Sequence, residues 1–196
     1  CLFHQSKTQI IDAVKDDIKT FNPLKQTCLQ TDWSRDGIGY LLLQKYCDCE
    51  SKQIRTCCPE GWKLIYAGSR FTSPAESRYS PTEGEALALI WSLKHSRIFT
   101  QGCNNLVIAV DHKPLLGIFN NSDLNTITNP RLQNMKETSF GWTFQIVYNP
   151  GKWHRGPDAL SRHPGSKIST KNEDHQNALL AVNRIPGTLQ DHMICQ

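Results

Sequence analysis

One run of residues, LVIAV at 106–110, limits the folds open to this chain more than any other feature. A strand that is apolar at every position needs cover on both of its faces, which places it in a sheet with helices on each side. Aliphatic, aromatic and alternating residues predict further strands at 26–32, 37–45, 63–69 and 143–148. The first three of these follow one another closely, and we expect them to form an antiparallel meander.

Helices are predicted where apolar residues recur at intervals of three and four. The clearest begins at Ser80, because Pro81 suits the first helical position and Glu83 completes a capping box with Ser80. The other predicted helices cover 8–19, 113–120, 129–139 and a segment that begins near 155. This order of elements predicts an α/β fold, with a five-stranded mixed sheet and helices on both faces.

The bulk composition sets only wide limits on function. The 196 residues suffice for one well-filled domain with segments at its ends, and no apolar run approaches the roughly 20 residues that cross a bilayer, so we expect no membrane anchor. A net charge of +4 permits nucleic-acid binding without requiring it. Because the chain starts at Cys1, with no initiator Met or secretory leader, we expect a piece of a longer intracellular protein with reduced thiols.

Half of the eight cysteines fall in a polar insert at 46–61: Cys47, Cys49, Cys57 and Cys58. They form a C-x-C and a C-C pair that are separated by seven residues. Four thiolates can bind zinc, but structural zinc sites more often use C-x2–4-C spacing. The spacing therefore disfavours zinc, although zinc ranks ahead of a disulfide.

Four acidic residues stand where a purely structural role is hard to assign. Asp32 ends the first strand, Asp111 follows LVIAV, and the other two lie early in helices: Glu85 and Asp158. Taken singly, the helix acids could favour the helix dipole, and the strand acids could cap turns or form ion pairs. All four can nevertheless face the crevice at the carboxyl ends of the strands, where ligands usually bind in open sheets.

Clustered carboxylates repel one another unless a divalent cation neutralises them. Hard oxygen ligands select Mg²⁺, with Mn²⁺ as an alternative. Two such ions about 4 Å apart can activate a water and stabilise the leaving oxygen of a phosphodiester. The four acids together therefore indicate metal-dependent hydrolysis of a phosphodiester.

Four segments resemble, in order, the signature segments of the ribonuclease H domain in the Pol polyprotein of gypsy-type LTR retrotransposons: TDWSRDGIGYLLLQ, AGSRFTSPAESRYSPTEGEALALIWSLKHSR, AVDHKPLLGIF and YNPGKWHRGPDALSR. This resemblance implies a ribonuclease H-like fold that cleaves the RNA strand of RNA–DNA hybrids during reverse transcription. It also implies that the catalytic, metal-binding carboxylates are Asp32, Glu85, Asp111 and Asp158. Glu85 is preferred to Glu83 because Glu83 already caps its helix, although the reverse assignment stays open.

The resemblance also implies an organisation for the whole chain. Residues 1–21 resemble the tail of the reverse transcriptase connection region, 22–164 form the ribonuclease H-like domain with its insert at 46–61, and 165–196 form a polar linker toward an integrase. The expected partners are an RNA–DNA hybrid and the reverse transcriptase and integrase regions of the same polyprotein, with no membrane. The expected location is intracellular, in a cytoplasmic virus-like particle of a retroelement.

Three positions depart from the family pattern. Trp33 stands where a small residue is usual, and His154 stands where Asn is usual. Cellular members carry a His, thought to assist product release, at the position of Tyr148, so His112 and His154 are the auxiliary candidates here. His112 could instead be a loop residue that orients Asp111.

Contact with the substrate should be electrostatic, and directed at phosphates and 2′-hydroxyls rather than at bases. Basic residues that flank the acidic motifs are the candidate contacts: Lys113, Lys152, Arg155 and Arg162. Each of them could instead be a solvated surface charge.

Two other functions are weighed beside the nuclease. A degenerate fragment could keep the fold as a structural tether or a hybrid-binding module, which the Trp33 and His154 departures would support. Strand transfer, as in integrases, is a further alternative. The order Asp, Glu, Asp, Asp and the lack of a terminal acidic helix of the integrase type argue against it.

Overall fold

The computed structural model describes residues 18–50, 57–58, 61–121 and 123–164. The chain divides into two compact units, Cys1–Gly165 and Ser166–Gln196, and the second lies wholly outside the described residues. Most of the predicted helix at 8–19, most of the segment 1–21 and all of the segment 165–196 also lie outside them. These domain boundaries therefore stay predictions.

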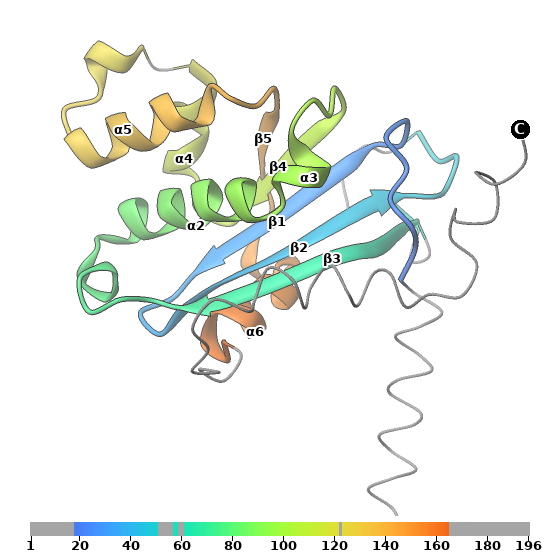
Figure 1. Cartoon of the computed structure of the whole chain (residues 1–196), viewed down its shortest axis with the longest axis horizontal. Helices are drawn as coiled ribbons and strands as arrows, with labels where there is room; N and C mark the ends of the chain where they lie inside the picture. Colours follow the sequence, from blue (N-terminus) through green and yellow to red (C-terminus); the bar gives the residue numbers. More distant parts are fainter. Residues whose placement is uncertain (1–17, 51–56, 59–60, 122, 165–196) are drawn as a thin grey trace, which may run out of the picture. The chain divides into compact units, whose positions relative to one another are not determined.

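The strands form one mixed sheet of five members in the order β3-β2-β1-β4-β5 (Figure 1). Their bounds are β1 Thr27–Trp33, β2 Gly37–Lys45, β3 Trp62–Phe71, β4 Leu106–Val110 and β5 Gln145–Tyr148. The first three strands pair antiparallel, as the predicted meander requires, whereas β4 pairs parallel with both β1 and β5. The predicted five-stranded mixed sheet is confirmed.

Helices occupy most of the remaining described residues. Their bounds are α2 Pro81–His95, α3 Arg97–Thr100, α4 Pro114–Leu116, α5 Pro130–Ser139 and α6 Arg155–Arg162. Shorter turns are η2 Glu76–Arg78, η3 Gly117–Asn121, η4 Leu124–Thr126 and η5 Gly151–Trp153, of which η3 has π-helical geometry. The Ser80 cap and its capping box with Glu83 are confirmed. Within the described residues, no helix has the length and apolarity that crossing a membrane requires.

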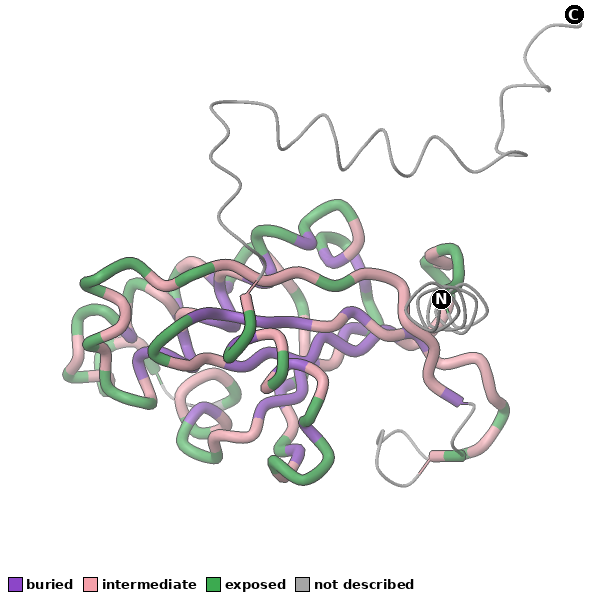
Figure 2. Tube along the Cα trace, turned by 90° about the horizontal axis from the view of Figure 1, so that it is seen from below, coloured by how far each residue is buried: buried purple, intermediate pink, exposed green. Residues whose placement is uncertain are grey.

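Helices cover both faces of the sheet, as predicted. Tyr40 of β2 packs its ring against Trp91 of α2, at 5.6 Å between ring centroids. The preceding strand residue, Gly39, instead lies against α6. Because successive strand residues point to opposite faces, α2 and α6 cover opposite sides of the sheet. Figure 1 shows the same arrangement, and Figure 2 shows the buried residues running through the middle of the described part.

The glycines of β2 allow α6 to approach the sheet closely. A Cβ atom on Gly39 would lie 2.5 Å from the Cβ of Leu160 and 2.6 Å from the carbonyl oxygen of Pro157. A Cβ on Gly37 would lie 2.7 Å from the carbonyl oxygen of Ser161. Any side chain at either position would push the helix away. This close approach brings α6 next to β1, which carries Asp32.

Candidate active site

Strand register brings the predicted strand carboxylates together. Gln30 of β1 lies beside Ala109 of β4 in the parallel pair, so Asp32 and Asp111 each lie two residues beyond this pair, at the carboxyl ends of neighbouring strands. Glu85 comes from the second turn of α2. Carboxylate oxygens of Asp32, Glu85 and Asp111 all lie within 4.8 Å of one another. We call these three residues the acidic group.

Two members of the acidic group are buried, and their carboxyl groups have raised pKa values. Asp32 is 5% exposed and Glu85 is 6% exposed, whereas Asp111 is half-buried. Burial, followed by the charges of Asp32 and Asp111, raises the pKa of Glu85 to about 9. Burial also raises the pKa of Asp32 to about 6. The hydroxyl of Ser161 donates a hydrogen bond to Asp32 Oδ2 at 2.5 Å, which partly offsets this rise in pKa. The group therefore resists full ionisation unless a positive charge joins it.

The ligand atoms of the acidic group fit a hard divalent cation. Glu85 Oε2 is buried and has no hydrogen-bond partner among the described residues, and Oε1 accepts only a long hydrogen bond, 3.4 Å, from the Trp33 backbone N–H. A buried carboxylate oxygen without a partner is costly. Mg²⁺ and Mn²⁺ prefer oxygen ligands of this kind, so a cation here would supply the missing partner.

The fourth predicted ligand, Asp158, does not join the acidic group. It lies in the first turn of α6, its side chain is 43% exposed, and its Oδ1 accepts a hydrogen bond from Nε of Arg162 at 2.7 Å. Its charge nevertheless contributes to the raised pKa of Asp32. The structure thus brings three of the four predicted carboxylates together and places the fourth near them, in an ion pair.

The two glutamates of α2 have opposite surroundings. Glu83 accepts hydrogen bonds from the backbone and hydroxyl of Ser80, at 3.0 and 2.9 Å, and from Asn129 and Arg131 at 3.0 and 3.1 Å. These donors, Asn129 first, lower the pKa of Glu83 to about 2. Because Glu83 is fully engaged in capping and Glu85 belongs to the acidic group, the geometry supports the preference for Glu85 as the ligand.

Trp33, which the sequence left unexplained, packs against α2. A Cβ atom on Gly84 would lie 2.2–2.6 Å from three atoms of the Trp33 ring, so the indole occupies the space that a side chain at Gly84 would need. The Trp33 backbone also donates the hydrogen bond to Glu85. Sequence reasoning missed Gly84, although a lone Gly inside a regular helical pattern signals a packing constraint.

The first auxiliary candidate, His154, is held in place by buried hydrogen bonds. It is fully buried, its Nε2 lies 2.8 Å from the carbonyl oxygen of Thr31, and Asn149 donates to its Nδ1 at 3.3 Å. Since a carbonyl only accepts, Nε2 carries the proton. Burial lowers the pKa of His154, which keeps the ring neutral. His154 therefore ties β1 to the start of α6, and its auxiliary role stays a prediction.

The other auxiliary candidate, His112, is half-buried, and its Nε2 lies 2.9 Å from the hydroxyl of Thr82. The predicted phosphate contacts are all exposed: Lys113, Lys152, Arg155 and Arg162. Lys113 lies over the ring of Tyr148, at 5.0 Å from its centroid. Ser161 was missed, although its position three residues after Asp158 puts both on the same face of α6.

Comparison with known proteins gives a family for this fold and site. Residues 22–138 match the family model described as the RNase H-like domain found in reverse transcriptase. The retrovirus-related Pol polyprotein from transposon opus of Drosophila melanogaster is 33% identical over 96 residues, which cover 49% of this chain and 9% of that protein. The transposon Tf2-3 polyprotein of Schizosaccharomyces pombe is 29% identical over 187 residues, which cover 92% of this chain and 13% of that protein. The chain thus spans about a tenth of the length of these relatives.

A solved structure shares this fold. The foamy viral protease-reverse transcriptase dRH in complex with double-stranded DNA superposes with a TM-score of 0.51 at 8% identity, covering 74% of this chain and 25% of that one. RNase H1 from the archaeon Halobacterium salinarum NRC-1 gives a TM-score of 0.47 at 16% identity, covering 70% and 95%. With more than half of its residues matched by the family model, the chain belongs to the RNase H-like domain family found in reverse transcriptase.

Proposed function

We propose that this chain is a metal-dependent ribonuclease H that hydrolyses the RNA strand of RNA–DNA hybrids. The observation that carries the proposal is the convergence of Asp32, Glu85 and Asp111 within 4.8 Å, at the carboxyl ends of two parallel strands. Membership of a reverse transcriptase domain family supports it, as do relatives that are transposon polyproteins. We further propose that the parent element is of the gypsy type and that the enzyme works inside an intracellular, cytoplasmic virus-like particle.

The acidic group would hold the first divalent cation, and Asp158 would complete the position of a second. When bound, Mg²⁺ or Mn²⁺ supplies a more acidic water and positive charge beside the phosphodiester that is cleaved. Ser161 fixes the orientation of Asp32 through its hydrogen bond, and the Trp33 backbone restrains Glu85. Arg162 holds Asp158 near the group, where its exposed carboxylate can reach a ligand that arrives from solvent.

The exposed basic residues would bind the hybrid through its phosphates. Lys113 follows Asp111 by two residues, and Lys152, Arg155 and Arg162 lie on both sides of Asp158 along the chain. Phosphate contacts of this kind weaken steeply as salt rises. The remaining proposed partners are the reverse transcriptase and integrase regions of the same polyprotein, as the multi-domain relatives suggest.

A cleavage assay with a matched control tests the proposal. The purified chain is incubated with an end-labelled RNA–DNA hybrid and Mg²⁺ or Mn²⁺, beside Asp111→Asn and the control Asp36→Asn, which changes an exposed aspartate in the β1–β2 turn. We expect cleavage by the parent chain and the control. We expect a loss of roughly a hundredfold or more in Asp111→Asn, because several kcal/mol of charge stabilisation depend on the ligand.

A parallel binding measurement separates the nuclease from the non-enzymatic alternative. Hybrid binding by the parent chain, without cleavage in either metal, would support a degenerate hybrid-binding module. Equal cleavage by the parent chain and Asp111→Asn would instead show that the acidic group is not the active site.

A further inference from the structure

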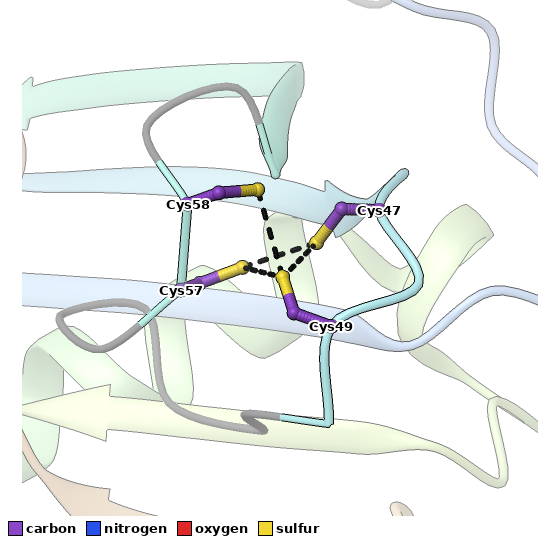
Figure 3. A group of neighbouring side chains, drawn as sticks. All are labelled: Cys47, Cys49, Cys57 and Cys58. Atoms are coloured by element: carbon purple, nitrogen blue, oxygen red, sulfur yellow. Dashed lines mark hydrogen bonds between the residues drawn. The ribbon is translucent and has the colours of Figure 1, made fainter.

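The four cysteines of the insert converge on one point, although they come from opposite sides of the β2–β3 hairpin (Figure 3). The Sγ atom of Cys47 lies 2.9 Å from that of Cys49 and 3.1 Å from that of Cys57. The Sγ atom of Cys49 lies 3.5 Å from that of Cys57 and 3.6 Å from that of Cys58. All four sulfurs lie within 4.8 Å of one another. We call these residues the thiol cluster.

The separations fit sulfurs that share a cation better than sulfurs that share a bond. A disulfide requires about 2.0 Å between sulfurs, and the cysteines of the cluster are free thiols. Four thiolates around zinc, each about 2.3 Å from the ion in tetrahedral geometry, would be about 3.8 Å apart. The cluster therefore needs shifts of less than about 1 Å to reach zinc geometry, and no rearrangement of the hairpin.

Strand pairing brings the two cysteine pairs together despite their spacing in the sequence. Lys45 and Trp62 close the β2–β3 ladder, Tyr46 N–H donates to the Gly61 carbonyl at 2.7 Å, and Gly61 N–H donates to the Cys58 carbonyl at 2.9 Å. These bonds hold the two cysteine pairs face to face across the end of the hairpin. The usual C-x2–4-C spacing places two zinc ligands on one turn. That spacing is not needed where strand pairing brings two cysteine pairs together.

The absence of a side chain at Gly61 lets the sulfurs of the cluster lie close together. A Cβ atom on Gly61 would lie 2.4 Å from the sulfur of Cys57, 2.7 Å from that of Cys47 and 3.0 Å from that of Cys58. Any side chain there would force at least two sulfurs apart. The Lys45 ammonium also donates a hydrogen bond to the Cys49 carbonyl, which fixes the loop and adds positive charge beside the thiols.

We propose that Cys47, Cys49, Cys57 and Cys58 bind one structural Zn²⁺ ion that closes the end of the β2–β3 hairpin. Binding replaces four S–H bonds by four Zn–S bonds and releases the protons to solvent, with no change of oxidation state. A site with four protein ligands has no open position for a substrate, so its role is structural. Lys45 lies six positions along β2 from Gly39, the partner of Asp32, so the site lies roughly 20 Å from the acidic group.

The protonation of the cluster agrees with this role. Hydrogen bonds from the neighbouring thiols, that of Cys47 first, lower the pKa of Cys49 to about 6, which makes it the first thiolate available to a metal. Burial, with the hydrogen bonds and charges of Cys47 and Cys49, raises the pKa of Cys57 to about 12.

Metal analysis of the reduced full-length chain tests the proposal without reference to nuclease activity. After zinc is supplied and the excess is removed, we expect elemental mass spectrometry to find one zinc ion per chain. Cobalt in its place should give thiolate charge-transfer absorption in the near ultraviolet and the strong visible bands of a tetrahedral site. Cys47→Ser and Cys57→Ser should each lose the bound zinc, and Gly61→Ala should bind it more weakly with all four thiols intact.

Cys103→Ala is the matched control, because Cys103 is buried in the main core and should leave the zinc content unchanged. Circular dichroism of each variant shows whether lost zinc reflects a lost ligand or a lost fold. The proposal is overturned if the reduced parent chain holds no zinc, holds iron instead, or loses as much zinc in Cys103→Ala as in Cys47→Ser. An intact mass that is reduced by the hydrogens of two disulfides under non-reducing conditions would also overturn it.

Discussion

The acidic group and the thiol cluster both gather side chains of the kind that can bind a cation, but the fold builds them in different ways. The acidic group draws on β1, α2 and the end of β4, spans residues 32 to 111 and is largely buried. The thiol cluster draws on one hairpin, spans residues 47 to 58 and is half-exposed. The sheet and its helices can hold the acidic group together against its own repulsion. A short hairpin end has fewer contacts of this kind, so the proposed zinc would contribute much of its stability.

The largest expected effect is on cleavage by Asp32→Asn. The change removes one ligand and one of three converging negative charges, so hybrid cleavage should fall roughly a hundredfold or more while the free energy of unfolding does not decrease. Single-turnover cleavage and urea unfolding measure the two quantities. Zinc content should stay at the level of the parent chain. A simultaneous loss of zinc would show that the two sites are coupled rather than independent.

The next effect is the pH dependence of stability in the metal-free chain. Glu85 has its pKa raised from 4.5 to about 9 in the folded state, so the folded chain keeps a proton that the unfolded chain releases. The stabilisation that this proton on Glu85 gives to the folded chain is complete below pH 4.5 and is lost as the pH rises toward 9. With EDTA present, the free energy of unfolding should fall by about 2 kcal/mol between pH 6 and pH 8.

Glu85→Gln provides the control for this slope. It cannot ionise, so its unfolding free energy should vary much less between pH 6 and pH 8 and should exceed that of the parent chain at pH 8. Urea denaturation at several pH values measures both quantities. An unchanged slope in Glu85→Gln would show that Glu85 is ionised in the metal-free fold.

A third test concerns the packing that positions the acidic group. Gly84→Ala places a methyl group within 2.2 Å of the Trp33 ring, so it should lower the free energy of unfolding by about 1–3 kcal/mol, despite the better helix propensity of Ala. Gly117→Ala is the control, because a Cβ there meets nothing within 4 Å, and it should change stability by less than about 0.5 kcal/mol. Equal unfolding midpoints for the two variants would contradict the contact between Trp33 and α2.

The smallest expected effect separates the two glutamates of α2. Glu83→Ala removes the side chain that caps the helix and accepts hydrogen bonds from Asn129 and Arg131, so it should lower the free energy of unfolding by about 1 kcal/mol. Glu85→Gln should raise that free energy at neutral pH. Opposite signs in thermal or urea unfolding would sharpen the distinction between a capping and a ligand glutamate. Changes of the same sign in the two variants would contradict that distinction.

Local features of the sequence predicted most of the elements. The apolar run at 106–110 became a strand with buried residues at four of its five positions, and the Ser80 capping box starts α2 where expected. Boundaries were less accurate: a strand was expected at 143–148, yet β5 covers Gln145–Tyr148. Propensity and periodicity act over a few residues, so they predict what an element is better than where it stops.

Part of the candidate site could also be predicted from the sequence. Asp32 and Asp111 follow predictable strands, and strand ends in one open sheet meet at one edge, so their convergence could be foreseen. The ion pair of Asp158 with Arg162 follows from i,i+4 spacing on α6 but was not anticipated. The assignment of the four carboxylates as catalytic stays a prediction until cleavage is measured.

By itself, the sequence determined the strands, the capped helix and the kinds of ligand that the chain carries, because these depend on neighbours a few residues apart. Only the tertiary structure decided which of those ligands meet. Sheet register set Asp32 beside Asp111 and brought the two cysteine pairs face to face. The fold buried His154 against the Thr31 carbonyl of β1, and packing of α2 accommodated Trp33 over Gly84. Such contacts join residues far apart in the chain, so they exist only after the whole core has formed.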